Sequence, residues 1–222
     1  METIMGAGMD KQLVCRILVY ILGLLTMAFG VVFSINSDLG VSPIVSLPLV
    51  ISEIMGITIG TITTATFAFL ILLQILILRK DFKWYNLSQI VFSFIFGYFM
   101  DFAIFLHGGF AFASYPGRFL MMVIGFVLIS LGIVFFMEAK LVPLPVEGLC
   151  DALTQATGIK FYIYKIIVDA AFVVLALGLT FLFLPGIVGI REGTVIGMIL
   201  VGKLIPHLTN AFLQFLQRIK AL

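Results

Sequence analysis

The chain has 222 residues, of which 62% are hydrophobic and 11% charged, and its 13 Lys and Arg nearly balance its 11 Asp and Glu, for a net charge of +2. An average soluble domain has about 25% charged residues, so this composition excludes a water-soluble globule and indicates a protein that lies in the lipid bilayer. Nucleic acid is excluded as a partner, because the longest basic run is Arg79-Lys80 and phosphate backbones require clustered Lys and Arg.

Six runs of about 20 mainly apolar residues are long enough to cross a hydrocarbon core about 30 Å thick. In chain order they cover residues 13–36, 59–78, 85–107, 117–137, 161–184 and 193–215. The first run is longer than the apolar part of a signal peptide, and no small-residue cleavage site follows it before Asn36. We therefore expect it to stay in the mature protein as the first span.

The basic residues in the loops and near the ends of the spans predict the orientation of the chain. With the N-terminus in the cytoplasm, nine of them lie inside, against Arg118 and Arg191 outside. We therefore expect a multi-pass protein of the bacterial plasma membrane with both termini cytoplasmic. The nine are Lys11, Arg16, Arg79, Lys80, Lys83, Lys140, Lys160, Arg218 and Lys220.

Two further segments, residues 39–57 and 141–159, are too apolar for loops and are broken by prolines. Counting both as full spans would leave six basic residues inside against five outside, which removes the bias. Half-helices, re-entrant or interfacial, fit better. Irregular backbone at membrane depth is tolerated only where it is buried in protein or lines a cavity, so we expect both segments in the interior.

The chain also matches itself at a constant offset of 102 residues, from 16–57 onto 118–159, with 11 of 42 positions identical. Glycines and prolines carry the match, which indicates shared backbone geometry rather than shared apolar composition. The informative pairs are Gly23/Gly125, Gly30/Gly132, Pro43/Pro145 and Gly56/Gly158.

The predicted fold is thus an all-α polytopic membrane protein, one domain over residues 1–222, with repeats at 13–107 and 117–215. Each repeat has three spans and one proline-broken half-helix. Because three is odd, the second repeat enters the bilayer from the opposite face, which gives an inverted-topology repeat of the kind found in transporters.

Interrupted segments at corresponding positions of two halves are the best sequence pointer to a binding site. Pro43 and Pro145 each suit the first turn of a helix, whose free N–H groups attract negative charge. The alternative is that both prolines merely turn the chain. Glu147, where the first half has Val45, is interpreted either as a helix cap or as a ligand for a cation or proton.

Charges within the spans are the other candidates, since each costs roughly 2.5–3.5 kcal/mol on insertion scales. Lys165 and Asp169 lie four residues apart on one helix face, so the amine can neutralise the acid in a structural or a functional pair. Asp101 and Lys203 occupy the third spans of the two halves, where we expect them to approach one another. The predicted solute-binding set is Pro43, Ser46, Asp101, Pro145, Glu147, Lys165, Asp169 and Lys203.

No metal site or cofactor is predicted, because Cys15 and Cys150 are far apart and His107 and His207 are isolated. No nucleophile or phosphate loop occurs in any span, so we do not expect an enzyme. Arg191 and Glu192 open the last span and are interpreted as an anchor at the outer face, or as a site that admits anions.

Six short motifs together resemble one family: LGVSPI at 39–44, GITIGT at 56–61, GYFMD at 97–101, LPVEG at 144–148, KIIVD at 165–169 and REGT at 191–194. They are similar to the bacterial integral membrane proteins of the YczE/YitT type. The resemblance implies a polytopic inner-membrane protein with two related halves, often described as a transporter without an established substrate, and it implies no catalytic residue. Lys203 departs from the pattern, which has an uncharged residue there.

We expect a secondary transporter that moves a small polar or charged solute by alternating access between its two halves. The alternative is a non-transporting membrane protein, either a scaffold for a membrane enzyme or the solute-binding subunit of a multi-component transporter. The residues do not choose between a cation, an anion and a zwitterion. They also leave open the direction, the coupling ion and the number of chains per assembly, a homo-oligomer included.

Overall fold

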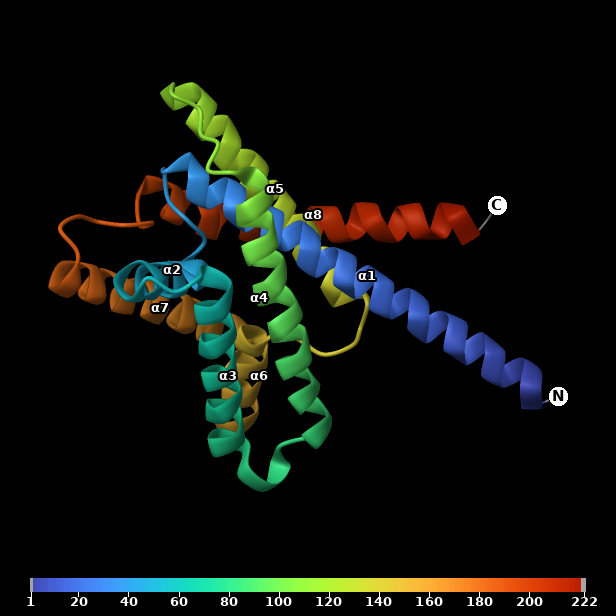
Figure 1. Cartoon of the computed structure of the whole chain (residues 1–222). Coiled ribbons are helices and arrows are strands. Elements are labelled where there is room, and N and C mark those ends of the chain that lie inside the picture. Colours follow the sequence, from blue (N-terminus) through green and yellow to red (C-terminus); the bar gives the residue numbers. More distant parts are fainter. Residues whose placement is uncertain (1, 221–222) are drawn as a thin grey trace.

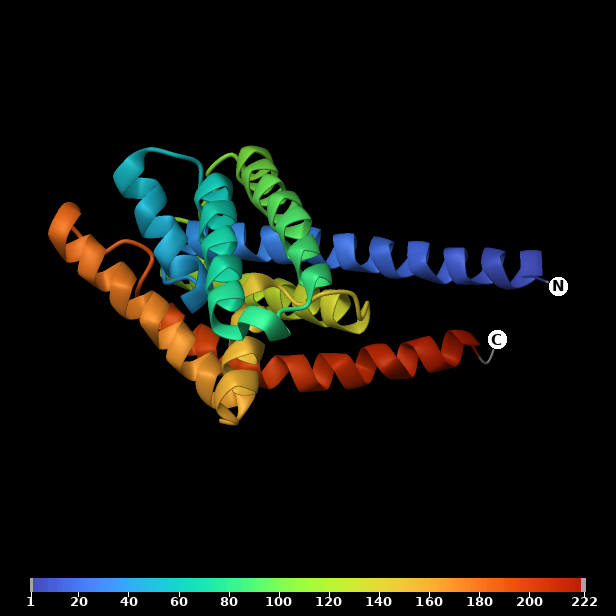
Figure 2. The same ribbon diagram turned by 90° about the horizontal axis from the view of Figure 1, so that it is seen from below.

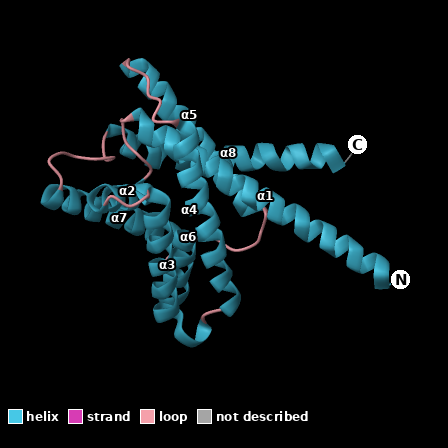
Figure 3. Ribbon diagram, viewed as in Figure 1, coloured by secondary structure: helices cyan, strands magenta, loops and turns pink. Residues whose placement is uncertain are grey.

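The computed structural model describes the backbone of residues 2–220 and the side chains of residues 12–214. Over that range the chain forms helices joined by loops, with no strand (Figures 1 and 3). The helices are α1 (Glu2–Ser37), α2 (Pro43–Met55), α3 (Ile59–Leu78), α4 (Ser88–His107), α5 (Tyr115–Glu138), α6 (Pro145–Thr157), α7 (Phe161–Phe183) and α8 (Glu192–Lys220), with short 3-10 helices at Arg79–Asp81 and Trp84–Leu87.

Six of these helices are long and apolar enough to cross a membrane, and each coincides with a predicted span to within a few residues. The all-α fold class and the six candidate spans are therefore confirmed. The side chains of Lys11, Arg218 and Lys220, which entered the orientation count, lie outside the described residues.

The remaining two α-helices are the predicted half-helices. Pro43 and Pro145 begin α2 and α6, where a proline needs no N–H partner. Gly56 and Gly158 end them in the left-handed conformation, with φ of 64° and 76°. At 13 residues each, both helices are too short to span a bilayer, as the prolines predicted.

Glycines bring α1 and α5 into backbone contact at the centre of the molecule. A Cβ added at Gly23 would lie 2.8 Å from the Gly132 carbonyl oxygen, and one at Gly30 would lie 2.6 Å from that of Gly125. As the residue number rises along α1, the number of the facing residue on α5 falls, so the two helices run antiparallel. Small residues permit this approach, which is typical of packing between membrane helices.

These contacts are exchanged by the offset of 102 found in the sequence. Gly23 and Gly132 correspond to Gly125 and Gly30, so each close contact is the counterpart of the other. The half-helices follow the same rule, because α2 packs on α7 of the other half and α6 packs on α3. The two halves therefore share their interface contacts as well as their sequence pattern.

The two halves differ in how their last two spans pack, α3 on α4 in the first half and α7 on α8 in the second. We call each of these helix pairs a hairpin. Gly60 of α3 and Gly97 of α4 cross in backbone contact, and a Cβ on Gly97 would lie 2.5 Å from the Gly60 carbonyl oxygen. In the described part of the chain, α7 and α8 have no comparable packing. At the offset of 102, Tyr162 of α7 corresponds to Gly60. On α8, nothing lies within 4 Å of a Cβ added at Gly202, so this glycine makes no close helix contact within the described residues. A tyrosine in place of a glycine prevents the second hairpin from closing in the same way.

The core lies where α1 and α5 meet the half-helices and α4. Its largest fully buried side chains include Tyr20, Phe96 and Phe126. The N-terminal part of α1 and the C-terminal part of α8 extend from the same side of this core in both views (Figures 1 and 2). The loop that follows α1 and the loop that follows α5 lie at opposite ends of the α1–α5 pair.

Candidate functional site

A cavity of about 410 Å³ opens where the loop after α5 turns into α6. The walls come from the end of α5, this loop, the first two turns of α6 and the start of α7. Three charged side chains face it, together with six apolar ones. The lining residues are Phe136, Met137, Lys140, Leu141, Val142, Pro143, Glu147, Asp151 and Phe161.

Contacts from α1 hold the loop that forms the cavity. Arg16 donates from Nε to the Ala139 carbonyl at 2.7 Å and from its guanidinium to the Lys140 carbonyl. The Tyr20 hydroxyl, four residues on, donates to the Val142 carbonyl at 3.1 Å in the interior. Since Arg16 and Tyr20 lie one turn apart on one helix face, the loop is bound to the first half along its length.

Glu147 is the acid of this cavity. Its Oε2 atom is fully buried and has no hydrogen-bond partner among the described residues. Burial raises the pKa of Glu147 above its usual range, and the positive charge of Lys165 acts in the opposite direction. Burial also raises the pKa of Asp151, which lies one turn further along α6. An orphaned buried carboxylate oxygen is unusual in a folded protein and marks a site for a proton or a ligand.

Lys165 and Asp169 form the predicted ion pair on α7, with 2.8 Å between Nζ and Oδ1. Both side chains are mostly buried, at 29% and 17% exposed. The pair lies close to Glu147, but the Lys165 ammonium is bonded to Asp169, the acid on its own helix. Glu147 is therefore left without a cation in direct contact.

A pair of glutamines fastens α6 to the first half. Gln74 of α3 and Gln89 of α4 exchange amide hydrogen bonds of 3.1 and 3.3 Å, and both are almost fully buried. Gln74 also donates to the Pro145 carbonyl at 3.0 Å. A Cβ added at Gly148 would lie 2.8 Å from the Gln74 amide oxygen, so a larger residue here would displace the bonded glutamine amides. The first turn of α6 is thus held by side chains of the other repeat.

The corresponding turn of α2 is satisfied locally. Pro43 and Ser46 are both buried, and the Ser46 hydroxyl donates to the Pro43 carbonyl at 2.6 Å. Neither residue lines the cavity. The structure therefore brings Pro145, Glu147, Lys165 and Asp169 together and places Pro43 and Ser46 on the equivalent half-helix.

The predicted pairing of Asp101 with Lys203 is wrong. Asp101 accepts from the Gly60 backbone N–H at 2.8 Å and from the Thr58 hydroxyl at 2.7 Å, so it caps the start of α3 from α4. Lys203 is exposed on α8, and no ion pair joins it to Asp101 within the described residues. Because the α3–α4 hairpin closes tightly and α8 does not pack on α7, equal depth in the sequence did not bring the two charges together.

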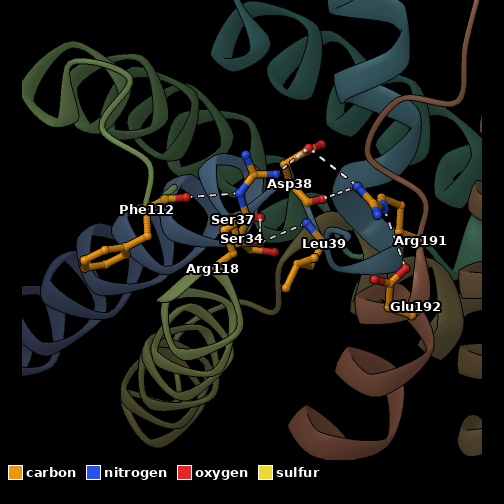
Figure 4. Close-up of polar contacts among 8 residues, drawn as sticks. All are labelled: Ser34, Ser37, Asp38, Leu39, Phe112, Arg118, Arg191 and Glu192. Carbon is orange, nitrogen blue, oxygen red and sulfur yellow. Dashed lines mark hydrogen bonds and ion pairs between the residues drawn. The ribbon is translucent and has the colours of Figure 1, made fainter. Parts of the chain in front are cut away.

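A second polar cluster lies at the opposite end of the α1–α5 pair (Figure 4). Asp38, which follows α1, pairs with Arg118 at 3.1 Å and with Arg191 at 3.5 Å. Arg191 also donates to the Asp38 carbonyl at 2.8 Å and lies 3.5 Å from Glu192. Arg191 thus anchors the last span, as one interpretation of the sequence had it, by a bond to the first half.

The loop after α1 is closed by backbone contacts as well. The Gly193 N–H donates to the Leu39 carbonyl at 2.7 Å, and the Val41 N–H donates to the Gly189 carbonyl at 2.8 Å. A Cβ added at Gly193 would lie 2.5 Å from the Leu39 carbonyl oxygen, which explains the glycine of the REGT motif. At this end the two halves are joined by these backbone hydrogen bonds and by the ion pairs of Asp38.

Several of these residues had a signal in the sequence that was not used. Gln74 is the one amide in an otherwise apolar or hydroxyl-bearing α3, where a polar group needs a buried partner. Asp38 and Lys140 correspond through the offset of 102, and both have positive φ, at 54° and 51°. A charged residue in each of the two matched loops could therefore have indicated the two ends of the α1–α5 crossing.

The helices define a polytopic α-helical membrane protein with two half-helices that begin at proline. Residues 14–210 match the family described as a family of unknown function, DUF6198, and the chain belongs to this family.

Two relatives come from Bacillus subtilis (strain 168). The chain is 28% identical to the uncharacterized membrane protein YczE over 151 residues, 68% of each chain. It is 26% identical to the uncharacterized protein YyaS over 200 residues, 90% of this chain and 92% of YyaS. The resemblance to proteins of the YczE type is thereby confirmed. No solved structure matches the chain.

Proposed function

We propose that the protein is a secondary transporter that moves a small polar or charged solute across the bacterial plasma membrane by alternating access. One observation carries the proposal: the α1–α5 crossing has a charged cavity at one end and a closed, ion-paired contact between the halves at the other. A carrier needs this arrangement, because its site must open to one side while the other side is sealed.

The exchanged contacts support an inverted-topology repeat. An antiparallel α1–α5 crossing whose contacts map onto one another implies a two-fold axis perpendicular to these helices, and hence in the membrane plane. In the opposite state, the segment after α1, with Pro43 and Ser46 on α2, would take the open position that the loop after α5 has here. The first turn of α2, with Pro43 and Ser46, would then border the open pathway in that state, as the first turn of α6, with Pro145 and Glu147, does in this one.

The distribution of basic residues favours a cavity that faces the cytoplasm. Lys140, with Lys160 and the basic residues between α3 and α4, lies at the cavity end, whereas Arg118 and Arg191 lie at the closed end. By the positive-inside rule this distribution of charge supports an inward-open state with both termini cytoplasmic. Asp38 with its two arginines would be the outer gate.

The roles proposed for the predicted residues differ. Glu147 meets the solute or a proton in the cavity, and the Lys165–Asp169 pair sets the charge behind it. Asp101 holds the α3–α4 hairpin as a fixed support. Lys203, exposed on α8, would face the partner chain of a homo-oligomer or the lipid headgroups.

The test is reconstitution of the purified chain alone in liposomes, with amines, amino acids and organic acids screened for gradient-driven flux. We expect flux that Glu147→Gln abolishes and that the matched variant Glu53→Gln, on the exposed face of α2, retains. Asp169→Asn, which frees Lys165, should lower it. Solute retention without flux would reject transport and favour a solute-binding subunit, and neither retention nor flux would favour a scaffold.

Sidedness has its own measurement. In a background without Cys15 and Cys150, Asp151→Cys should react with a membrane-impermeant maleimide only from the cytoplasmic side. Asp38→Cys should react only from outside. Reaction of both from one side would contradict the proposed orientation of the halves.

A further inference from the structure

The cavity also carries information about the charge of its solute. We propose that it binds a small organic cation with an apolar body, and that the Glu147 carboxylate is the counter-ion. This inference rests on the proposed function for its biological meaning, but it concerns binding and can be tested without transport.

The charges of the cavity wall favour a cation. Two acids, Glu147 and Asp151, face the space against one base, Lys140. Lys140 lies on an exposed turn, so its amine can extend into water, whereas Glu147 is deep in the wall. Lys165 does not alter the balance, since its ammonium is bonded to Asp169 at 2.8 Å. With both acids ionised, the cavity lining therefore has an excess of one negative charge.

The unpartnered oxygen indicates where the cation binds. Oε2 of Glu147 is buried and accepts no hydrogen bond from the described residues, although the carboxylates of Asp101 and Asp169 are both satisfied. Leaving such an atom unpaired costs about 1–3 kcal/mol or more. An ammonium in the cavity would supply the missing donor, and an anion would meet a second acceptor there instead.

The rest of the wall favours an apolar body on the solute. Phe136 and Phe161 contribute aromatic rings, and Met137, Leu141 and Val142 add aliphatic and thioether surface. Aromatic faces attract a cation as well as apolar groups. The volume of about 410 Å³ is at the small end of ligand pockets, which range over about 300–1,000 Å³. A single-ring amine matches this space better than a bare metal ion.

Protons should compete with this solute. Burial raises the pKa of Glu147, so its carboxylate takes up a proton more readily than an exposed acid. A proton on Glu147 removes the counter-ion, so affinity for the cation should rise with pH until the carboxylate is ionised. Among the described residues around it, α3 and α4 contribute the amides of Gln74 and Gln89. The ionisable groups nearby include Tyr20, Lys140, Cys150, Asp151, Lys165 and Asp169.

The test is equilibrium binding to the purified chain in nanodiscs, by calorimetry, with three probes of similar size: benzylammonium, benzyl alcohol and phenylacetate. We expect the cation to bind most tightly and its affinity to increase from pH 5 to pH 8. Glu147→Gln should weaken cation binding roughly tenfold or more and remove the pH dependence. Glu53→Gln should change neither.

A second variant protects the test against a folding defect in Glu147→Gln. Lys140→Gln removes the opposing charge from the rim and should tighten cation binding severalfold, an effect no loss of fold can mimic. Tighter binding of phenylacetate than of the cation, or unchanged cation binding in Glu147→Gln, would overturn the inference. Cation binding without flux in liposomes would keep the inference and reject transport, and flux of an unrelated solute without cation binding would do the reverse.

Discussion

The two inter-helix loops, residues 38–42 after α1 and 139–144 after α5, are equivalent in sequence but differ in their surroundings. The first is clamped by the segment that leads into α8, through two backbone hydrogen bonds and the pairing of Asp38 with two arginines. The second is held only from α1 and borders the cavity. Segments that match in sequence can thus be bound tightly in one half and border a cavity in the other.

The difference arises from a few residues. Val45 and Ser46 of α2 correspond to Glu147 and Gly148 of α6, which add a buried acid and make room for the two glutamines. Gly60 of α3 corresponds to Tyr162 of α7, which keeps the second hairpin open. The first half therefore provides the rigid support and the second half the charged chemistry.

The largest effect is expected where the halves are alike. Gly23→Ala and Gly125→Ala each place a methyl group 2.8 Å from a facing carbonyl oxygen, and should each cost about 3 kcal/mol of stability. Because the two positions are equivalent, the two losses should agree. Thermal unfolding in detergent measures them, with Gly178→Ala, which meets nothing within 4 Å, as the neutral control. Unequal losses would show that the crossing is not shared by the halves.

The next effect separates the hairpins. Asp101→Ala removes the acceptor for the Gly60 N–H and the Thr58 hydroxyl, and should cost about 1–2 kcal/mol of unfolding free energy. In α8, Pro206→Ala removes no such cap and should not destabilise the protein. Denaturation of both variants at equal detergent concentration makes the comparison. Equal losses in both would mean that α8 is supported as α4 is.

A smaller effect, dependent on pH, belongs to the acid that only the second half has. Burial raises the folded-state pKa of Glu147, so its contribution to stability is complete below the usual carboxyl pKa and is lost as pH rises through the raised value. Glu147→Gln should therefore be about 1 kcal/mol more stable than the wild type at pH 8 and equal to it at pH 4. Melting curves at the two pH values decide this. A variant that is less stable at pH 8 would contradict it.

The smallest effect concerns the sealed end. Asp38 is 67% exposed, so Asp38→Asn should cost less than about 1 kcal/mol of stability, and the loss should shrink at high salt. Unfolding at low and high ionic strength measures it, and Glu53→Gln is the control for loss of an exposed acid without a partner across the halves. A loss that does not depend on salt would mean that the backbone bonds of Leu39 and Val41 alone close this end.

The sequence was sufficient for the spans and the half-helices because each depends on local chemistry. Apolar length set the six spans, and Pro43 and Pro145 set the starts of α2 and α6. The Lys165–Asp169 pair followed from helical spacing alone. Contacts across elements were harder. The pairing of Asp101 with Lys203 was inferred from equal depth, but lateral position depends on whether Gly60 and Gly97 let the hairpin close.

The same reasoning explains why the cavity was only partly foreseen. Glu147 was a candidate because it replaces Val45, but Phe136 and Phe161 carry no local sign that they share a wall with it. Nor does Gln74 indicate which carbonyl it will reach, since Pro145 is 71 residues away. Such partners are set by how α6 docks, and docking depends on small residues such as Gly148.

The glycine contacts between α1 and α5 bear on ancestry. Because each contact is the counterpart of the other, two separate copies of a single three-span chain could have met through this same surface as an isologous pair. Fusion of the two genes would then have required no new interface, only a linker such as residues 108–114. Once joined, the copies were free to diverge, and one of them acquired an acid where the other kept a valine.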